Sequence, residues 1–78
     1  MRFTVLSDEG DRLGAVAFEG GRFDVEDLPN EAVGGRLQEH FRELRSAGGN
    51  DDLEHLVRAT LERVSAETGF RFVREPDA

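Results

Sequence analysis

The chain has 78 residues, a formal charge of −7 at neutral pH and no cysteine. This length predicts one small domain, and the missing thiols exclude disulfides and thiolate zinc sites. The acidic balance argues against a domain that binds nucleic acid through general electrostatics, because such domains are usually basic.

The pair Gly20–Gly21 is typical of a two-residue hairpin turn between strands at 13–19 and 22–26, because glycine readily takes the positive φ angles of such turns. A phosphate-binding loop would need a helix after the glycines, whereas here Arg22 and a strand follow. The turn pairs Glu19 with Arg22 and places four apolar side chains on one face: Val16, Phe18, Phe23 and Val25.

A loop over residues 8–11 joins a first strand at 2–6 to this hairpin. The loop length places Phe3 opposite Val16 and Val5 opposite Gly14, so that Gly14 leaves room beside Val5. The three strands form a meander with one apolar face. The other face holds polar residues and four apolar ones that we expect to form an interaction surface: Leu6, Leu13, Ala15 and Ala17.

A first helix follows, capped by Asp27 or Asn30 and ended by Gly48. Its apolar residues recur at helical spacing and form one stripe: Val33, Leu37, Phe41 and Leu44. The pair Gly34–Gly35 lies inside this pattern and disfavours a helix. Either the helix begins near Arg36, or the glycines admit a close neighbour.

A second helix begins after Asn50, which we expect to be its cap, with Asp51 and Asp52 at the positive end of the helix dipole. Glu54 and Arg58 have the spacing of an ion pair on its exposed side. Gly69 ends the helix and places Phe70 for an apolar contact with it. The apolar stripe comprises Leu53, Leu56, Val57, Leu61 and Val64.

A fourth strand at 70–75 lies antiparallel to the first or the third strand at a sheet edge. The element order βββααβ predicts an α+β fold, with a mostly antiparallel sheet packed on one face by an antiparallel helix pair. One domain covers residues 1–75 and a tail covers 76–78. The predicted core is Phe3, Val5, Val16, Phe18, Phe23, Val25, Leu37, Phe41, Leu44, Leu53, Leu56, Val57, Leu61, Val64, Phe70 and Phe72.

No motif predicts chemistry. His40 borders the first helical stripe, where a partly buried and hydrogen-bonded histidine is the ordinary outcome, and His55 faces away from the second stripe. The acidic loop at 7–12 lacks the twelve-residue spacing of a calcium loop. We therefore expect no catalytic residue, no metal and no cofactor.

These observations predict a non-enzymatic protein–protein interaction module, such as a regulator, an adaptor or a small subunit of a larger assembly, a viral particle among them. We expect it to self-associate through the open sheet face or an edge strand, because a core this small gains from further burial. The alternative is an acidic inhibitor or DNA mimic that binds the basic surface of a nucleic-acid-handling enzyme. The sequence has neither a signal-peptide run nor a membrane span, so we expect a cytoplasmic protein with a protein partner and no direct contact to nucleic acid or membrane.

Overall fold

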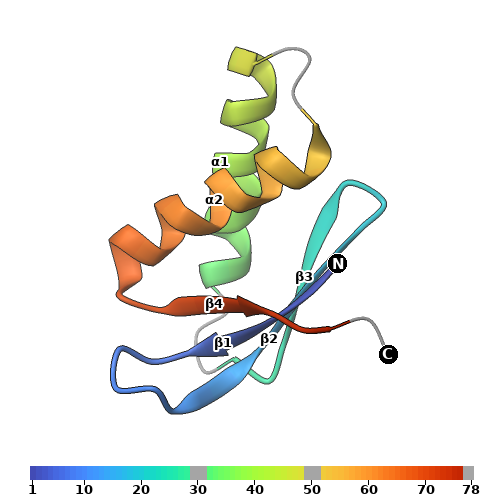
Figure 1. Cartoon of the computed structure of the whole chain (residues 1–78). Coiled ribbons are helices and arrows are strands. Elements are labelled where there is room, and N and C mark those ends of the chain that lie inside the picture. Colours follow the sequence, from blue (N-terminus) through green and yellow to red (C-terminus); the bar gives the residue numbers. More distant parts are fainter. Residues whose placement is uncertain (29–31, 49–51, 77–78) are drawn as a thin grey trace.

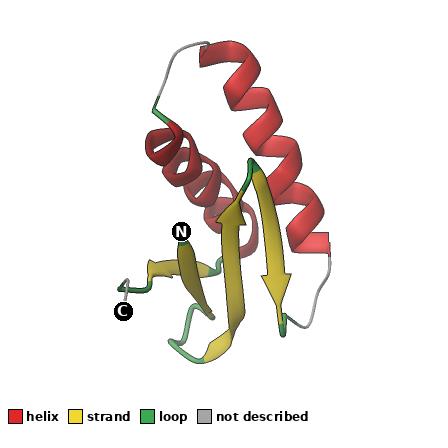
Figure 2. Ribbon diagram, turned by 90° about the vertical axis from the view of Figure 1, so that its right-hand side faces the viewer, coloured by secondary structure: helices red, strands yellow, loops and turns green. Residues whose placement is uncertain are grey.

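A computed structural model describes residues 1–28, 32–48 and 52–76. A four-stranded antiparallel sheet packs on one face against two helices, as the sequence predicts (Figures 1 and 2). The elements are β1 (Arg2–Leu6), β2 (Arg12–Glu19), β3 (Arg22–Glu26), α1 (Ala32–Gly48), α2 (Leu53–Thr68) and β4 (Arg71–Arg74). The strand order is β3-β2-β1-β4, so β4 lies beside β1 and both β3 and β4 are sheet edges.

The predicted hairpin between β2 and β3 is confirmed. Gly20 and Gly21 have φ angles of 59° and 77°, as a two-residue turn requires. Phe18 pairs with Phe23, and Glu19 pairs with Arg22. Because side chains alternate along a strand, this register directs the aromatic pair to the helices.

The pairing of β1 with β2 has the predicted register as far as Val5, which lies opposite Gly14. The register then shifts, and Leu6 pairs with Arg12 instead of Leu13. Such an extra residue interrupts the alternation of the strand. Leu13 is accordingly half-buried and packs against the core, which contradicts its predicted place on the open face.

The backbone of residues 26–28, and not the side chain of Val5, lies in the space that the missing side chain of Gly14 leaves. A Cβ atom at this position would lie 2.4 Å from the carbonyl oxygen of Glu26 and 3.0 Å from the backbone nitrogen of Leu28. Asp27, between these two residues, has a φ of 59°, an uncommon backbone conformation for a residue other than glycine. The chain leaving β3 therefore crosses closely over Gly14.

Three aromatic side chains form the centre of the core. The ring of Phe18 lies 4.8 Å from that of Phe23 and 5.1 Å from that of Phe41, between centroids. The buried apolar residues packed together are Phe3, Val5, Val16, Phe18, Phe23, Val33, Leu37, Phe41, Leu56, Val57, Leu61 and Val64. Of the predicted core, Val25, Leu44, Phe70 and Phe72 are only partly buried.

Leu53 was wrongly predicted as a core residue, since 48% of its surface is exposed. It is the first residue of α2, immediately after the cap Asp52, whose Oδ1 accepts a hydrogen bond from the Glu54 N–H at 3.4 Å. The N-cap is thus Asp52 and not Asn50, which itself lies outside the described residues. The helical spacing correctly predicts the other residues of the apolar stripe as buried, but Leu53, at the start of the helix, lies outside the core.

The other end of α2 follows the prediction. Gly69 adopts the left-handed conformation and donates its N–H to the Ser65 carbonyl at 2.8 Å. Phe70 then packs against the core, which is the contact expected beyond such a cap. The predicted pair Glu54–Arg58 is replaced by a contact of 2.5 Å between Glu54 and Arg74 of β4.

Helix α1 includes both internal glycines. It begins at Ala32, too far from Asp27 for that residue to be its cap, and Asn30 lies outside the described residues. A Cβ atom on Gly34 would touch Val25 of β3 at 3.4 Å, so this glycine does admit a close neighbour. Gly35 has nothing within 4 Å of the same position and serves no packing role.

We therefore expect Gly35→Ala to raise the free energy of unfolding by about 0.5–1 kcal/mol, because alanine favours the helix and restricts the unfolded chain. Gly34→Ala is the matched control. It gains the same helix propensity, and its methyl group makes an ordinary van der Waals contact with Val25, so its benefit is at least as large. Urea denaturation of both variants measures the difference, and destabilisation by Gly34→Ala would contradict the described spacing between α1 and β3.

Candidate functional site

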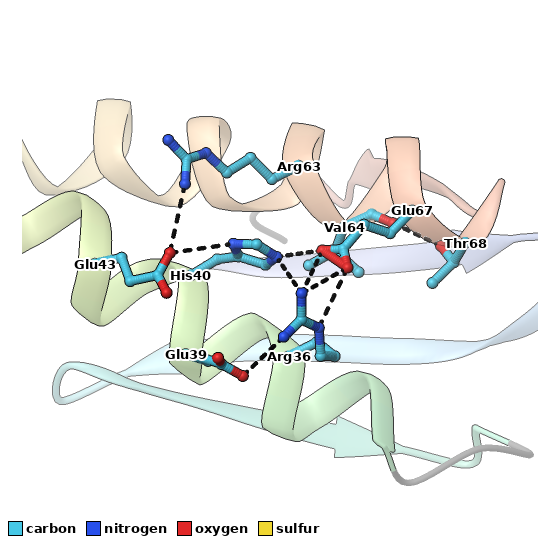
Figure 3. A network of polar contacts seen from close by, with 8 residues as sticks. All are labelled: Arg36, Glu39, His40, Glu43, Arg63, Val64, Glu67 and Thr68. Atoms are coloured by element: carbon cyan, nitrogen blue, oxygen red, sulfur yellow. Dashed lines mark hydrogen bonds and ion pairs between the residues drawn. The ribbon is translucent and has the colours of Figure 1, made fainter.

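A polar network joins α1 to α2 on the outer side of the helix pair (Figure 3). The guanidinium of Arg36 contacts Glu67 of α2 at 2.7 Å and Glu39 of its own helix at 2.8 Å. His40 also turns its Nε2 atom to the Glu67 carboxylate. The side chain of His40 is only 13% exposed, as expected for a histidine at the border of the stripe.

Protonation in this network follows from its contacts. The hydrogen bond from Arg36, and after it that from His40, holds the pKa of Glu67 below its ordinary value. Because an ionised carboxylate only accepts, His40 must donate from Nε2. Its Nδ1 is buried without a hydrogen-bond partner among the described residues, and the nearest carboxylate oxygen belongs to Glu43 at 3.9 Å.

The lowered pKa links Glu67 to folding. A carboxyl whose pKa is lower in the folded state stabilises the fold at pH values above its unfolded pKa. This contribution is lost as pH falls through the lowered folded value, and it is small because the group is exposed. The contacts of Arg36 and His40 with Glu67 act as a clamp between the two helices. The nearby hydroxyl of Thr68 takes no part in this clamp, because it donates to the Val64 carbonyl (Figure 3).

The open sheet face is more polar than predicted. Arg2 of β1 reaches across β2 to Glu26 of β3 at 2.5 Å and also contacts Glu75 at 2.6 Å. Glu75 in turn accepts a hydrogen bond from Thr4 at 3.0 Å. Glu26 pairs with Ala15, so this ion pair spans the small side chains of β2.

The four residues predicted for this face therefore differ in accessibility. Ala15 has no exposed surface and offers nothing for a partner to touch. Leu13 packs against the core, while Leu6 and Ala17 are half-buried. The structure does not bring the four together as a flat apolar surface.

The two edges of the sheet differ in their accessibility. On β3 the Phe23 N–H faces outward and donates to the side-chain oxygen of Gln38 in α1 at 3.2 Å. Along β4, no helix side chain among the described residues bonds to the backbone of Phe72 or Arg74. Val73 of the same strand is 47% exposed, which makes it one of two exposed large apolar residues in the described part of the chain.

A cleft of about 520 Å³ lies between α2 and the β1–β4 side of the sheet. Its apolar lining residues are Met1, Phe3, Leu61, Ala66 and Phe72. Its polar lining residues, which we call the rim, are Glu54, Arg58, Glu62, Ser65 and Arg74. Because Phe72 and Arg74 of β4 line the cleft, the cleft adjoins this edge, and we call the two together the β4 flank.

Comparison with known proteins adds nothing to this description. No family model, curated protein or solved structure matches the chain. Within the described ranges, no three histidine or acidic side chains are grouped so that they could hold a metal ion. Over the same residues, neither helix has the length and apolar character needed to cross a bilayer.

The sequence did not reveal the β4 flank. Its helical rim residues Glu54, Arg58 and Glu62 recur every fourth position, a pattern that also fits any solvated helix face. The predicted strand at 70–75 contained Val73 but left its neighbour undecided. Only the strand order shows that β4 is an outer strand with α2 above it.

Proposed function

We propose that this protein is a non-enzymatic interaction module that associates with itself through the β4 flank. The observation that carries the proposal is a contrast between the two sheet edges: Gln38 of α1 accepts the outward Phe23 N–H of β3, whereas β4 presents its backbone beside exposed Val73. An unpaired strand edge is a ready template for another chain. We place this activity in the cytoplasm as part of the same proposal.

Two further features support this surface over the open sheet face. The ion pairs of Arg2 cover part of the open face, and Ala15 has no exposed surface there. Half of the residues that line the cleft beside β4 are instead apolar, and their exposed surface gains from being covered. In the helix clamp, Arg36 and His40 are both engaged with Glu67, so this histidine has a structural use that needs no substrate.

Light scattering behind a sizing column, in low and in high salt, tests self-association. We expect a folded dimer in both conditions, because backbone pairing and apolar burial do not depend on salt as exposed ion pairs do. Far-UV circular dichroism on the same fractions establishes that the chain is folded. A folded monomer at every concentration would contradict the proposal.

The acidic-inhibitor alternative rests on the charge of −7 and makes the opposite prediction. It expects a monomer that binds a basic partner only at low salt. The interspersed arginines weaken it, since Arg36, Arg2 and Arg74 each neutralise a carboxylate within the fold.

A further inference from the structure

The free hydrogen-bonding groups of β4 belong to Phe72 and Arg74. The Glu75 N–H donates to the Arg2 carbonyl of β1 at 2.9 Å. Because alternate residues of an antiparallel strand face the same neighbour, Arg71 and Val73 also face β1, and Phe72 and Arg74 face outward. The backbone groups of Phe70 also face outward, but side chains of α2 already bind them. The Thr68 hydroxyl accepts from the Phe70 N–H at 3.1 Å, and the Ser65 hydroxyl donates to the Phe70 carbonyl at 2.5 Å.

From this pattern we infer that β4 pairs antiparallel with β4 of a second copy in one register, with Val73 facing Val73 at the twofold axis. The inference rests on the proposed self-association and names its partner and its geometry. In this register Phe72 of each copy lies opposite Arg74 of the other. The two residues exchange both of their outward backbone hydrogen bonds, and no group already bonded within the chain is needed.

The neighbouring register is less favourable. With Phe72 at the twofold axis, Arg74 would lie opposite Phe70, whose backbone groups are held by α2. Arg71 would then face Val73 of the other copy and gain no charge partner. The next register in the other direction would place Pro76, which lacks an N–H, opposite an outward-facing residue.

The side chains agree with the register that centres on Val73. Arg71, Val73 and Glu75 share the open side of β4, so Arg71 of each copy lies opposite Glu75 of the other. Charged residues on an edge strand usually oppose pairing. Here the opposite charges meet in this register, where Arg71 adds to the contacts that Glu75 already makes with Arg2 and Thr4, so the charges favour it instead. Val73, which is 47% exposed in the single chain, becomes covered by its symmetry mate.

A single cysteine tests the register, because the chain contains none of its own. Directly opposed residues that are not hydrogen-bonded have Cα atoms about 4.5 Å apart, within the range that a disulfide spans. We expect Val73→Cys to form a covalent dimer under mild oxidation. Asp24→Cys, an exposed position on β3, is the matched control. The Val73 variant is expected to react at least about tenfold faster, since its partner sulfur is held at an effective concentration in the millimolar range.

The outcomes separate this inference from the proposed function. A dimer by light scattering, with Val73→Cys cross-linking no faster than Asp24→Cys, would overturn the β4 register and leave self-association standing. A wild-type monomer at all concentrations would overturn both.

A backbone variant gives a second test. Arg74→Pro removes the outward N–H but no bond to β1, and proline is tolerated at such edge positions. Arg74→Ala is its control, since it loses the same contact to Glu54 but keeps the N–H. We expect the dimer of the proline variant to have a higher dissociation constant than the dimer of the alanine variant. Circular dichroism is expected to show that both variants are folded. Equal dissociation would contradict the inferred backbone pairing.

Discussion

Phe41→Ala is expected to remove most of the stability of the fold. Phe41 is 2% exposed and contacts the rings of both Phe18 and Phe23, with centroids 5.1 and 5.6 Å away. Truncating a buried phenylalanine costs about 3–5 kcal/mol. A single core in a chain of this length rarely supplies more than about 3–5 kcal/mol in total, so the variant has little margin left. Urea denaturation followed by far-UV circular dichroism measures the loss.

Leu53→Ala is the matched control for this prediction. Sequence periodicity assigns Leu53 and Phe41 alike to the core, but Leu53 is 48% exposed. We expect its truncation to change the free energy of unfolding by less than about 0.5 kcal/mol. A loss at Leu53 comparable to that at Phe41 would mean that α2 packs on the sheet one turn earlier than described.

The sequence was sufficient where neighbouring residues decide the structure. The turn at Gly20–Gly21 fixes which residues of β2 and β3 face each other, and the apolar alternation then admits one register. Gly69 and Phe70 likewise form a local cap whose geometry follows from the two residues. The α+β fold and the core were predictable on this basis.

The rest depends on residues that are distant in the chain. Helical spacing places His40 at the border of the first stripe, but its partner Glu67 lies on the other helix, and no local pattern connects them. The bulge beside Leu13 changes a strand face, and from the sequence we interpret the adjacent Gly14 as room for Val5 rather than as the signal of a bulge. Arg2 and Glu26 meet across β2 beside the buried Ala15, and this contact follows only from the strand order.

The sequence predicts self-association through the open sheet face or an edge strand, and the choice of the β4 edge over the open face depends on distant residues for the same physical reason. The alternation within each strand predicts an apolar face that includes Leu6 of β1 and Ala17 of β2. The exposure of these side chains depends on which residues the neighbouring strands place beside them. The proposed β4 flank becomes visible only once β4 is known to lie beside β1.

Gly14→Ala is expected to be the most damaging single-methyl change in the described part of the chain. The added carbon would lie 2.4 Å from the Glu26 carbonyl oxygen and 3.0 Å from backbone atoms of Asp27 and Leu28. Backbone atoms cannot rotate away as a side chain does, so the chain leaving β3 must move. That movement would disturb the pairing of Glu26 with Ala15 and its contact with Arg2. Overpacking costs about 1–3 kcal/mol in ordinary cores, and we expect the upper end of this range or more.

Gly10→Ala separates this packing effect from backbone strain. Gly10 has a φ of 95° and no atom within 4 Å of an added Cβ, so its cost is conformational only, about 1–2 kcal/mol. Gly14 is the reverse case, because its φ lies outside the left-handed region and its surroundings are crowded. Denaturation of both variants gives the comparison, and amide exchange locates the damage: faster exchange in β3 than in β1 is expected for Gly14→Ala alone. Equal losses of unfolding free energy in the two variants, with uniform amide exchange, would show that the chain after β3 does not cross Gly14 as closely as described.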